Sequence, residues 1–216
     1  MRILEDLFGT TKPIIGMIHL AGRTSSEKIE RARRELAIFE RHGVNGAIVE
    51  DYHTNNVLDV MSALEELAKK KKTITLGVNL LQDPQVSFSL ADEFGAAFVQ
   101  LDTVLGPEDI YIEERNVYPD IAVLGGVRFK YTSSTGNSLE QDLEVGKSRC
   151  DAIVTTGSGT GIETPIAKLR EFRQQLSDFP LIVGSGVNKD NAYEQLSLAG
   201  GAIVGNYLKG GDTTRE

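Results

Sequence analysis

Residues 181–186 read LIVGSG and residues 202–206 read AIVGN, with a segment of helical spacing, Lys189–Leu198, between them. Each of the two runs is almost continuously apolar and ends in a turn that contains glycine. Strands that other elements cover on both faces have this composition, which is typical of parallel sheets. The stretch therefore predicts a strand, a crossover helix and a second, parallel strand.

The same alternation continues along the rest of the chain. The predicted strands are Ile14–Leu20, Gly46–Asp51, Ile74–Leu80, Phe98–Thr103, Ile121–Lys130, Ala152–Gly157, Leu181–Gly186 and Ala202–Asn206. The predicted helices are Ser26–His42, Asn56–Lys71, Pro84–Phe94, Leu139–Arg149, Thr164–Leu176 and Lys189–Leu198. An open sheet of eight strands would leave two edges, so a closed barrel is more economical. We therefore predict an α/β fold, a single (β/α)8 TIM barrel over residues 1–216.

Two segments depart from an ideal barrel. Residues 106–120, between strands four and five, offer at most a turn or two of helix before Pro119, so the fourth helix is expected to be abbreviated. After strand eight the sequence ends within 10 residues, which leaves no room for a full eighth helix. We expect residues 3–8, ILEDLF, and a partner subunit of a homo-oligomer to cover the flank of strands eight and one.

Charge and composition restrict the partners. The chain has 23 Lys and Arg against 31 Asp and Glu, a net charge of −8, which argues against nucleic acid and against peripheral contact with an anionic membrane. The run Lys69–Lys72 ends a predicted helix and is interpreted as solvent-facing. One cysteine, Cys150, fits a reducing compartment, and no apolar run could form a transmembrane segment. We expect a cytoplasmic protein.

The carboxyl ends of the predicted strands carry many polar residues, and reacting groups lie at these ends in a (β/α)8 barrel. They are His19, Glu50, Asp51, Asn79, Gln100, Asp102, Lys130, Thr156, Ser185 and Asn206. Any one of them can instead be a hydrogen-bonded filler of the barrel. As a ring of amides and carboxylates with one lysine, they predict a polar site.

Four of these residues are candidate catalytic groups. Lys130 is a candidate base or Schiff-base nucleophile, although binding a ligand anion is the favoured role. Glu50 and Asp102 suit acid and base roles at a sugar carbon, or magnesium binding, or an ion pair with Lys130. His19 is either a proton carrier or a hydrogen-bonded structural residue. An acidic pair with His19 and His53 could ligate a transition metal, but these residues lack a tight ligand spacing, so no metal site is assigned. Magnesium bound by Glu50 and Asp102 is the cofactor that stays open.

Glycine-rich turns follow strands six, seven and eight. They contain Gly157, Gly159, Gly161, Gly184, Ser185, Gly186, Gly205 and Asn206. Glycine lets backbone amides approach an oxyanion closely, and loops after strands seven and eight often bind phosphate in this fold. The alternative is that these glycines only make tight turns. Their spacing matches neither the dinucleotide fingerprint nor a P-loop.

Six stretches resemble the BtpA/SgcQ family of TIM-barrel proteins, collinearly from Leu7 to Thr214. They are LFGTTKPIIGMIHLAG, GVNGAIVEDY, ITLGVNLLQD, AIVTTGSGTG, LIVGSGVNKDNA and GGAIVGNYLKGGDTT. The resemblance implies a barrel of the ribulose-phosphate-binding type with a phosphate rim, in a family named partly for a protein required for photosystem I accumulation. On family motif positions lie His19, Glu50, Asn79, Lys130, Thr156, Gly157, Gly159, Gly161, Gly184, Ser185, Gly186 and Gly205.

The chain also departs from the family pattern. Residues 21–26 replace a proline-rich segment, and Tyr131 stands where a histidine usually follows the fifth-strand lysine. The fourth loop is shorter, and the C-terminal helix of the family is missing. These differences lie on the substrate side of the barrel, so no family reaction is carried over.

The favoured hypothesis is a protein that binds a phosphorylated small metabolite, a sugar phosphate or nucleotide-derived ligand, and acts as an isomerase, lyase or transferase. The predicted catalytic residues are Glu50, Asp102, Lys130 and His19. The predicted ligand-binding residues are Asn79, Thr156, Gly157, Gly159, Gly161, Gly184, Ser185, Gly186, Gly205 and Asn206. The alternative is a non-catalytic assembly or regulatory factor, with a role like photosystem biogenesis, whose shortened loops and missing helix expose an interaction surface.

Overall fold

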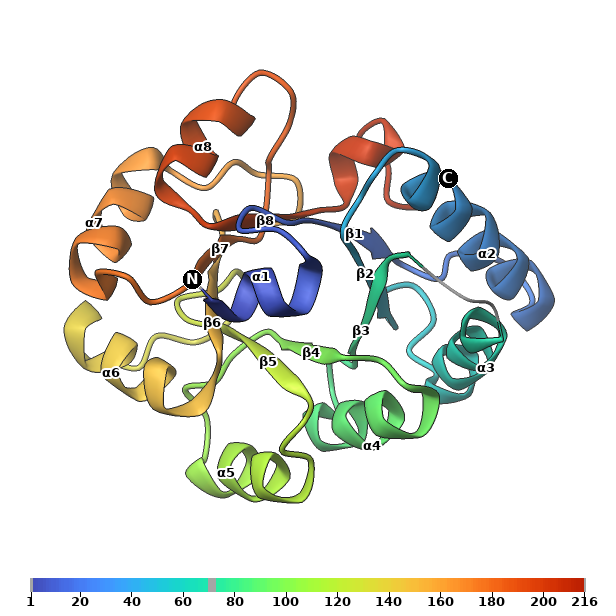
Figure 1. The fold of residues 1–216 in the computed structure, drawn as a ribbon, viewed down its shortest axis with the longest axis horizontal. Helices are drawn as coiled ribbons and strands as arrows, with labels where there is room; N and C mark the ends of the chain where they lie inside the picture. The colour runs from blue at the N-terminus through green and yellow to red at the C-terminus, as the bar shows by residue number, and fades with distance from the viewer. Residues whose placement is uncertain (1, 70–72, 216) are drawn as a thin grey trace.

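The computed structural model describes residues 2–69 and 73–215 of the chain as a closed barrel of parallel strands (Figure 1). Each strand pairs with the next, and β8 pairs with β1. The strands are β1 Ile14–Ile18, β2 Gly46–Glu50, β3 Thr75–Asn79, β4 Phe98–Leu101, β5 Ala122–Gly126, β6 Ala152–Thr155, β7 Leu181–Val183 and β8 Gly201–Val204. The predicted (β/α)8 barrel is confirmed, and every strand overlaps its predicted range.

Helices surround the barrel, and all but the first follow a strand (Figure 1). They are α1 Arg2–Phe8, α2 Ser25–Arg41, α3 Val57–Ala68, α4 Pro84–Phe94, α5 Glu108–Val117, α6 Leu139–Arg149, α7 Ile166–Leu176 and α8 Ala192–Leu198. Local signals set several boundaries: Ser138 and Gln141 form a capping box at α6, and Gly95 ends α4 in a left-handed conformation. The predicted end of α3 at Lys71, with Lys70 and Lys72 of the lysine run, lies outside the described residues.

Helix α5 has 10 residues and is longer than the turn or two predicted for this segment. Its residues Glu113, Glu114 and Arg115 favour helix, and the helix continues to Val117, two residues before Pro119. The start is hard to recognise in the sequence because the N-cap residue, Pro107, has no side chain that could cap the helix.

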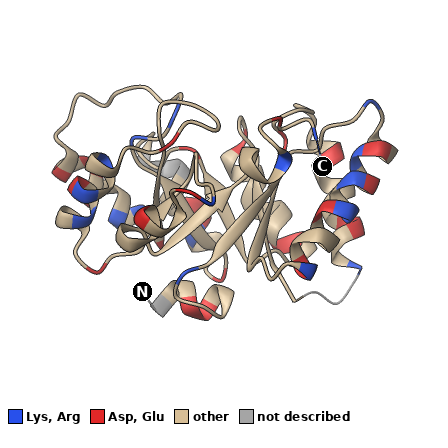
Figure 2. Ribbon diagram, turned by 90° about the horizontal axis from the view of Figure 1, so that it is seen from above, with Lys and Arg blue, Asp and Glu red and all other residues tan. Residues whose placement is uncertain are grey.

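Helix α1 closes the amino end of the barrel and does not cover the outer flank of β8 and β1, so that expectation for residues 3–8 is wrong. Leu4 and Phe8 belong to the apolar cluster inside the barrel. The ring of Phe8 meets that of Phe98 edge to face, with centroids 5.3 Å apart. Figure 1 shows α1 across the centre of the strands, and Figure 2 shows it beneath one end of them.

The C-terminal segment packs against α2 instead. After β8 the described chain contains a 3-10 helix, η1 Asn206–Lys209, and no full helix, as predicted. The ammonium group of Lys209 forms a buried ion pair with Glu35 of α2, and the guanidinium of Arg31 donates to the carbonyl of Thr214. These contacts fix the segment that follows β8 beside α2.

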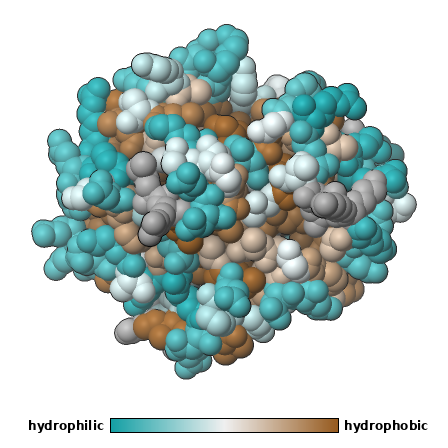
Figure 3. All heavy atoms as spheres, in the orientation of Figure 1, coloured by the Kyte–Doolittle hydropathy of each residue, from teal (hydrophilic) through white to brown (hydrophobic). Residues whose placement is uncertain are grey.

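The alternation of side chains along the strands separates two apolar regions. One lies between strands and helices, and the other fills the barrel interior up to about Met17, Ile48 and Ile203. Figure 3 shows the face of the molecule that carries α1, where hydrophilic residues predominate at the periphery. Within the described residues, no helix has the length and apolar character needed to cross a membrane.

Candidate functional site

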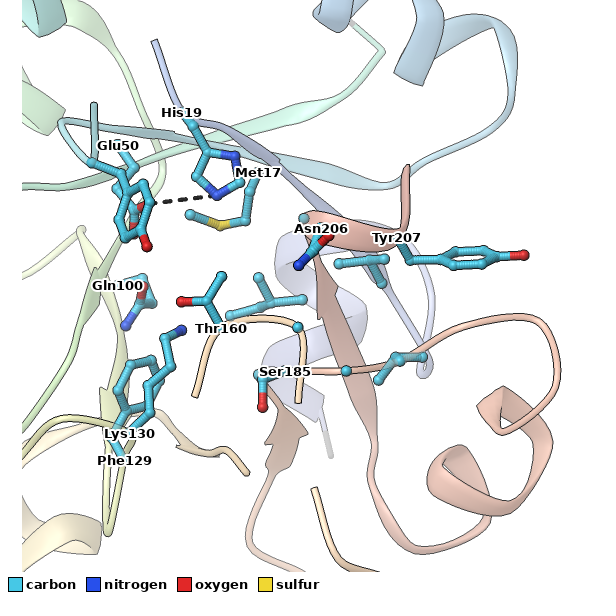
Figure 4. A pocket seen from close by; sticks show the side chains of 18 of the residues that line it. Met17, His19, Glu50, Gln100, Phe129, Lys130, Thr160, Ser185, Asn206 and Tyr207 are labelled. Atoms are coloured by element: carbon cyan, nitrogen blue, oxygen red, sulfur yellow. Dashed lines mark ion pairs between the residues drawn. The ribbon is translucent and has the colours of Figure 1, made fainter. Parts of the chain in front are cut away.

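A cavity of about 330 Å³ opens at the carboxyl ends of the strands (Figure 4). Strand alternation places the residue two positions beyond each interior apolar side chain on the cavity side. On β1, β2 and β4 these positions hold His19, Glu50 and Gln100, whereas on β7 and β8 they hold Gly184 and Gly205. One side of the cavity is therefore made of polar side chains, and the other side is made of backbone.

Most of the predicted site residues meet at this cavity. Its walls include His19, Glu50, Asp102, Lys130, Gly161, Gly184, Ser185, Gly186, Gly205 and Asn206. The structure thus brings together the predicted catalytic groups and the glycine turns after strands six, seven and eight.

Asn79, Thr156, Gly157 and Gly159 do not line the cavity, and their contact with a ligand stays a prediction. The hydroxyl of Thr156 accepts from the N–H of Lys130 at 2.6 Å. The N–H of Gly157 donates to the hydroxyl of Ser185 at 2.8 Å. A Cβ at Gly159 would lie 3.2 Å from the phenol oxygen of Tyr131. Thr156, Gly157 and Gly159 therefore lie next to Lys130, Ser185 and Tyr131, which line the cavity.

Asn79 is the centre of a buried polar cluster. Its amide nitrogen lies 3.0 Å from Oε1 of Glu50, 2.7 Å from Oε1 of Gln100 and 3.3 Å from Oδ1 of Asp102. An amide group has two hydrogens for these three oxygens. Gln100 also donates to Oδ1 of Asp102 at 3.2 Å. The cluster holds the carboxyl groups of Glu50 and Asp102 at the cavity wall.

Glu50 has a strongly altered acidity. Burial, followed by the charge of Asp102, raises the pKa of Glu50 to about 8 from an ordinary value of 4.5, although Lys130 and the bond from Asn79 act in the opposite direction. The carboxyl group is therefore protonated at neutral pH. Such a group can donate a proton to a ligand in the cavity.

His19 is also uncharged. Burial, followed by the positive charge of Lys209, lowers the pKa of His19 to about 3. Its Nε2 lies 3.7 Å from Oε2 of Glu50, a distance typical of an ion pair, but a neutral imidazole and a protonated carboxyl group form none at neutral pH. Within the described residues, Nδ1 of His19 has no hydrogen-bond partner. The neutral imidazole carries a proton on one ring nitrogen and can accept a second proton only at the other.

Lys130 projects into the cavity between the polar and the glycine-rich sides (Figure 4). Its Nζ lies 4.6 Å from the centroid of the Phe129 ring. No ion pair among the described residues includes Lys130, so the alternative that Glu50 or Asp102 is paired with it is wrong. Its amino group faces the space that a ligand would fill.

The glycine-rich side requires glycine. Gly186 has a φ of +68°, and a Cβ there would lie 2.3 Å from the backbone of Glu163. Gly161 has a φ of +74°, and a Cβ there would lie 2.2 Å from the amide nitrogen of Asn206. Within the described chain, the N–H groups of Gly161, Gly186 and Val187 donate to no other group. Unpaired backbone N–H groups at a cavity are typical of anion sites.

Magnesium would be held by carboxylate oxygens of Glu50 and Asp102, since this cation prefers oxygen ligands. In the described part of the chain, no group of three or more His, Cys, Asp or Glu residues has a metal-binding arrangement. Magnesium binding stays a prediction that rests on these oxygen atoms.

The sequence did not single out several residues of the cavity wall. They include Met17, Tyr52, Leu81, Phe129, Thr160, Val187, Asn188 and Tyr207. Alternation along β1 would have found Met17, two residues before His19. Thr160 lies between two glycines that were selected for their backbone, so its side chain was overlooked.

The family model for BtpA matches residues 10–216. The chain belongs to the BtpA family. It is 24% identical to the photosystem I biogenesis protein BtpA of a Synechocystis strain, over 95% of this chain and 83% of the relative. It is 26% identical to the putative sgc region protein SgcQ of Escherichia coli, over 97% and 90% of the two chains. The resemblance to the BtpA/SgcQ family is confirmed.

Several solved structures share the fold of this BtpA-family chain. Thiamine phosphate pyrophosphorylase from Pyrococcus furiosus has a TM-score of 0.64 at 18% identity, over 95% of this chain and 91% of the other. Phosphoribosyl anthranilate isomerase from Thermus thermophilus has a TM-score of 0.65 at 14% identity, over 94% and 92%. At these identities the similarity concerns the fold alone.

Proposed function

We propose that the cavity binds a phosphorylated small metabolite and that the protein acts on it by proton transfer, as an isomerase, lyase or transferase. The observation that carries the proposal is the arrangement of unpaired backbone N–H groups opposite a buried, protonated carboxyl group. The names of the structurally similar proteins, which include a phosphate and a phosphoribosyl group, support the same ligand class.

The phosphate subsite in this proposal is built from the glycine-rich side. Gly161, Gly186 and Val187 line the cavity, and their N–H groups have no partners in the described chain. Asn206, at the start of η1, lines the cavity and adds a side-chain amide whose Nδ2 can donate to a phosphate oxygen. Because the net charge of the chain is −8, attraction of an anion must come from such local dipoles and from Lys130.

The proton-transfer groups lie on the opposite side. Protonated Glu50 supplies an acid, and neutral His19, 3.7 Å away, supplies a base. The ammonium group of Lys130 stabilises negative charge that develops on a ligand oxygen between them. Burial, followed by the charge of Asp102, raises the pKa of Glu50 and keeps its carboxyl group protonated. A sugar phosphate, with a carbonyl and hydroxyl groups near its phosphate, suits this arrangement.

Thermal unfolding in the presence of inorganic phosphate, sugar phosphates and nucleotides, with and without magnesium, tests the proposal. A ligand that binds the folded state raises its unfolding temperature. Asn206→Asp changes almost no volume but adds a negative charge at the subsite, so it should abolish the shift. Asn116→Asp makes the same change at an exposed position of α5 and should retain it. If no compound shifts the unfolding of the folded wild type, the proposal is wrong.

A second candidate function is a non-catalytic assembly factor, favoured by the name of the Synechocystis relative and by a groove beside η1. This groove has a volume of about 120 Å³ and is lined by Ile38, Phe39, Val44 and Leu208. Ile38 and Leu208 are exposed. An Ile38→Asp, Leu208→Asp double variant should lose the in vivo function if this reading holds, whereas Asn206→Asp should lose it under the first proposal.

A further inference from the structure

The segment that carries Lys130 has an unusual backbone. Arg128, two residues before Lys130, has a φ of +49°, and Tyr131, the next residue, has a φ of +62°. Residues other than glycine seldom adopt this left-handed conformation, which persists only where neighbouring groups impose it. Because the amino group of Lys130 projects into the cavity, the groups that impose this backbone also determine where that amino group lies (Figure 4).

Lys168, on α7, supplies two contacts to this region. Its ammonium group donates to the backbone carbonyl of Arg128 at 2.7 Å and to the backbone carbonyl of Thr156 at 2.7 Å. Arg128 belongs to the segment that follows β5, and Thr156 directly follows β6. One ammonium group therefore joins the chain segments at the ends of two neighbouring strands.

Thr156 completes the connection between Lys168 and Lys130. Its hydroxyl accepts from the backbone N–H of Lys130 at 2.6 Å and donates to the carbonyl of Gly157 at 3.0 Å. Lys168 thus holds the carbonyl two residues before Lys130, and it also holds the residue whose hydroxyl binds the N–H of Lys130. If the ammonium group of Lys168 is lost, both attachments of the Lys130 backbone are weakened.

The charge of Lys168 is placed where it is not favoured. Burial, followed by the charge of Arg128, lowers the pKa of Lys168 to about 8. Arg128 has a carboxylate partner, since its Nε lies 3.0 Å from Oδ2 of Asp142. Among the described residues Lys168 forms no ion pair, and the oxygens that receive its hydrogen bonds are the two backbone carbonyls. The lysine therefore serves the backbone around Lys130.

We infer that Lys168 is a positioning residue, which holds the backbone around Lys130 so that the Lys130 amino group faces a ligand anion in the cavity. The inference rests on the proposed function, in which Lys130 attracts that anion. Lys168 is not among the residues of the cavity wall, so it acts through Lys130 and not on the ligand directly.

Amide hydrogen exchange at Lys130 tests the structural part of the inference without a ligand. Lys168→Met removes the ammonium group but keeps an unbranched side chain, and it should raise the exchange rate of the Lys130 N–H at least about tenfold relative to that of Val49 in β2, which reports global unfolding. Arg170→Met removes the same charge from an exposed position of α7 and should leave the relative rate within about twofold. An unchanged relative rate in Lys168→Met would overturn the inference.

Titration calorimetry with inorganic phosphate and with ribose 5-phosphate tests the functional part. For the probe that the wild type binds more tightly, Lys130→Met should weaken binding roughly 10- to 100-fold, because it removes a cation that faces the anion. Lys168→Met should weaken binding about fivefold, and Lys168→Arg, which keeps a long cationic donor, should recover most of this loss. Arg170→Met should stay within about twofold of the wild type.

A double variant tests whether Lys168 acts through Lys130. If it does, adding Lys168→Met to Lys130→Met should cause little further loss of affinity. Equal losses from Lys168→Met with and without the Lys130 side chain would overturn the inference. A Lys168→Arg variant that regains slow exchange at Lys130 but does not regain affinity would overturn it as well.

The remaining outcomes separate this inference from the proposed function. If Arg170→Met weakens binding as much as Lys168→Met does, the loss is a long-range effect of charge, and the inference is overturned while the phosphate site stands. The same conclusion follows if Lys130→Met binds both probes as the wild type does. If the wild type binds neither probe, the proposed phosphate site fails and the functional part of the inference fails with it, whereas the exchange rate still decides the structural part.

Discussion

Nε2 of His19 lies 3.7 Å from Oε2 of Glu50, and both side chains are buried. With ordinary pKa values of 6.5 and 4.5, the two groups would carry opposite charges at a pH between these values. Burial reverses this preference, because it lowers the pKa of His19 to about 3 and raises the pKa of Glu50 to about 8. The folded protein keeps a neutral acid beside a neutral base, and its stability must depend on pH at both residues.

Glu50→Gln should remove a loss of stability that the wild type shows above pH 4.5. The unfolded chain ionises Glu50 near 4.5, whereas the pKa of about 8 in the fold means that stability is lost as the pH rises through this window. Glu50 alone can change the free energy of unfolding by at most about 1.4 kcal/mol per pH unit. In urea, the free energy of unfolding of the variant, relative to that of the wild type, should be higher at pH 8 than at pH 5. An equal difference at the two pH values would contradict the buried, protonated carboxyl group.

His19→Gln should flatten the response to acid. Because the pKa of His19 is lowered in the fold to about 3, the unfolded chain binds the proton first, and stability is lost as the pH falls from 6.5 towards 3. Comparing unfolding temperatures at pH 7 and pH 4 measures this loss. His42→Gln, at an exposed position, serves as the control and should leave the acid response as it is in the wild type.

Gly186→Ala should lower the free energy of unfolding more than Gly9→Ala does, although both glycines have a φ near +70°. At Gly9 no atom lies within 4 Å of the added Cβ, so left-handed strain of about 1 kcal/mol is the whole effect. At Gly186 the Cβ also meets the backbone of Glu163, which raises the expected cost to about 2–5 kcal/mol. Chemical denaturation compares the two variants. Similar losses would show that the turn at Gly186 relaxes freely.

Leu4→Ala should destabilise the barrel by about 2–5 kcal/mol, because Leu4 is fully buried in the interior cluster. Leu58→Ala, at a side chain that is 63% exposed, is the control and should change stability little. The free energy of unfolding in urea measures both. A small effect at Leu4 would mean that α1 does not contribute to the barrel core.

Much of the fold follows from the sequence because strands that are covered on both faces, such as 181–183 and 201–204, must be apolar throughout. The site could be found in outline for a related reason: a polar residue that ends such a strand, as Glu50 does, is held at the mouth of the barrel. The position of a residue at a strand end does not reveal whether its side chain lines the cavity. Asn79 is paired in register with Glu50, but its amide donates to neighbouring side chains and it does not line the cavity. The hydroxyl of Thr156 accepts from the backbone N–H of Lys130 instead of facing the cavity.

Two features depend on tertiary contacts that no local pattern records. Helix α1 has 7 residues, too few for a clear periodicity, and its role appears only where Phe8 meets Phe98. The backbone N–H of Thr160 donates to the phenol oxygen of Tyr131, 29 residues away in the sequence. The C-terminal segment is similar, since the contact of Lys209 with Glu35 joins residues 174 positions apart.

The side chains of Leu4 and Phe8 have a consequence for access to the cavity. Because they fill the amino end of the barrel, a ligand cannot enter along the barrel axis from that end. A ligand that binds in the cavity must enter and leave at the carboxyl ends of the strands, where Tyr131, Asn206 and Tyr207 line the wall.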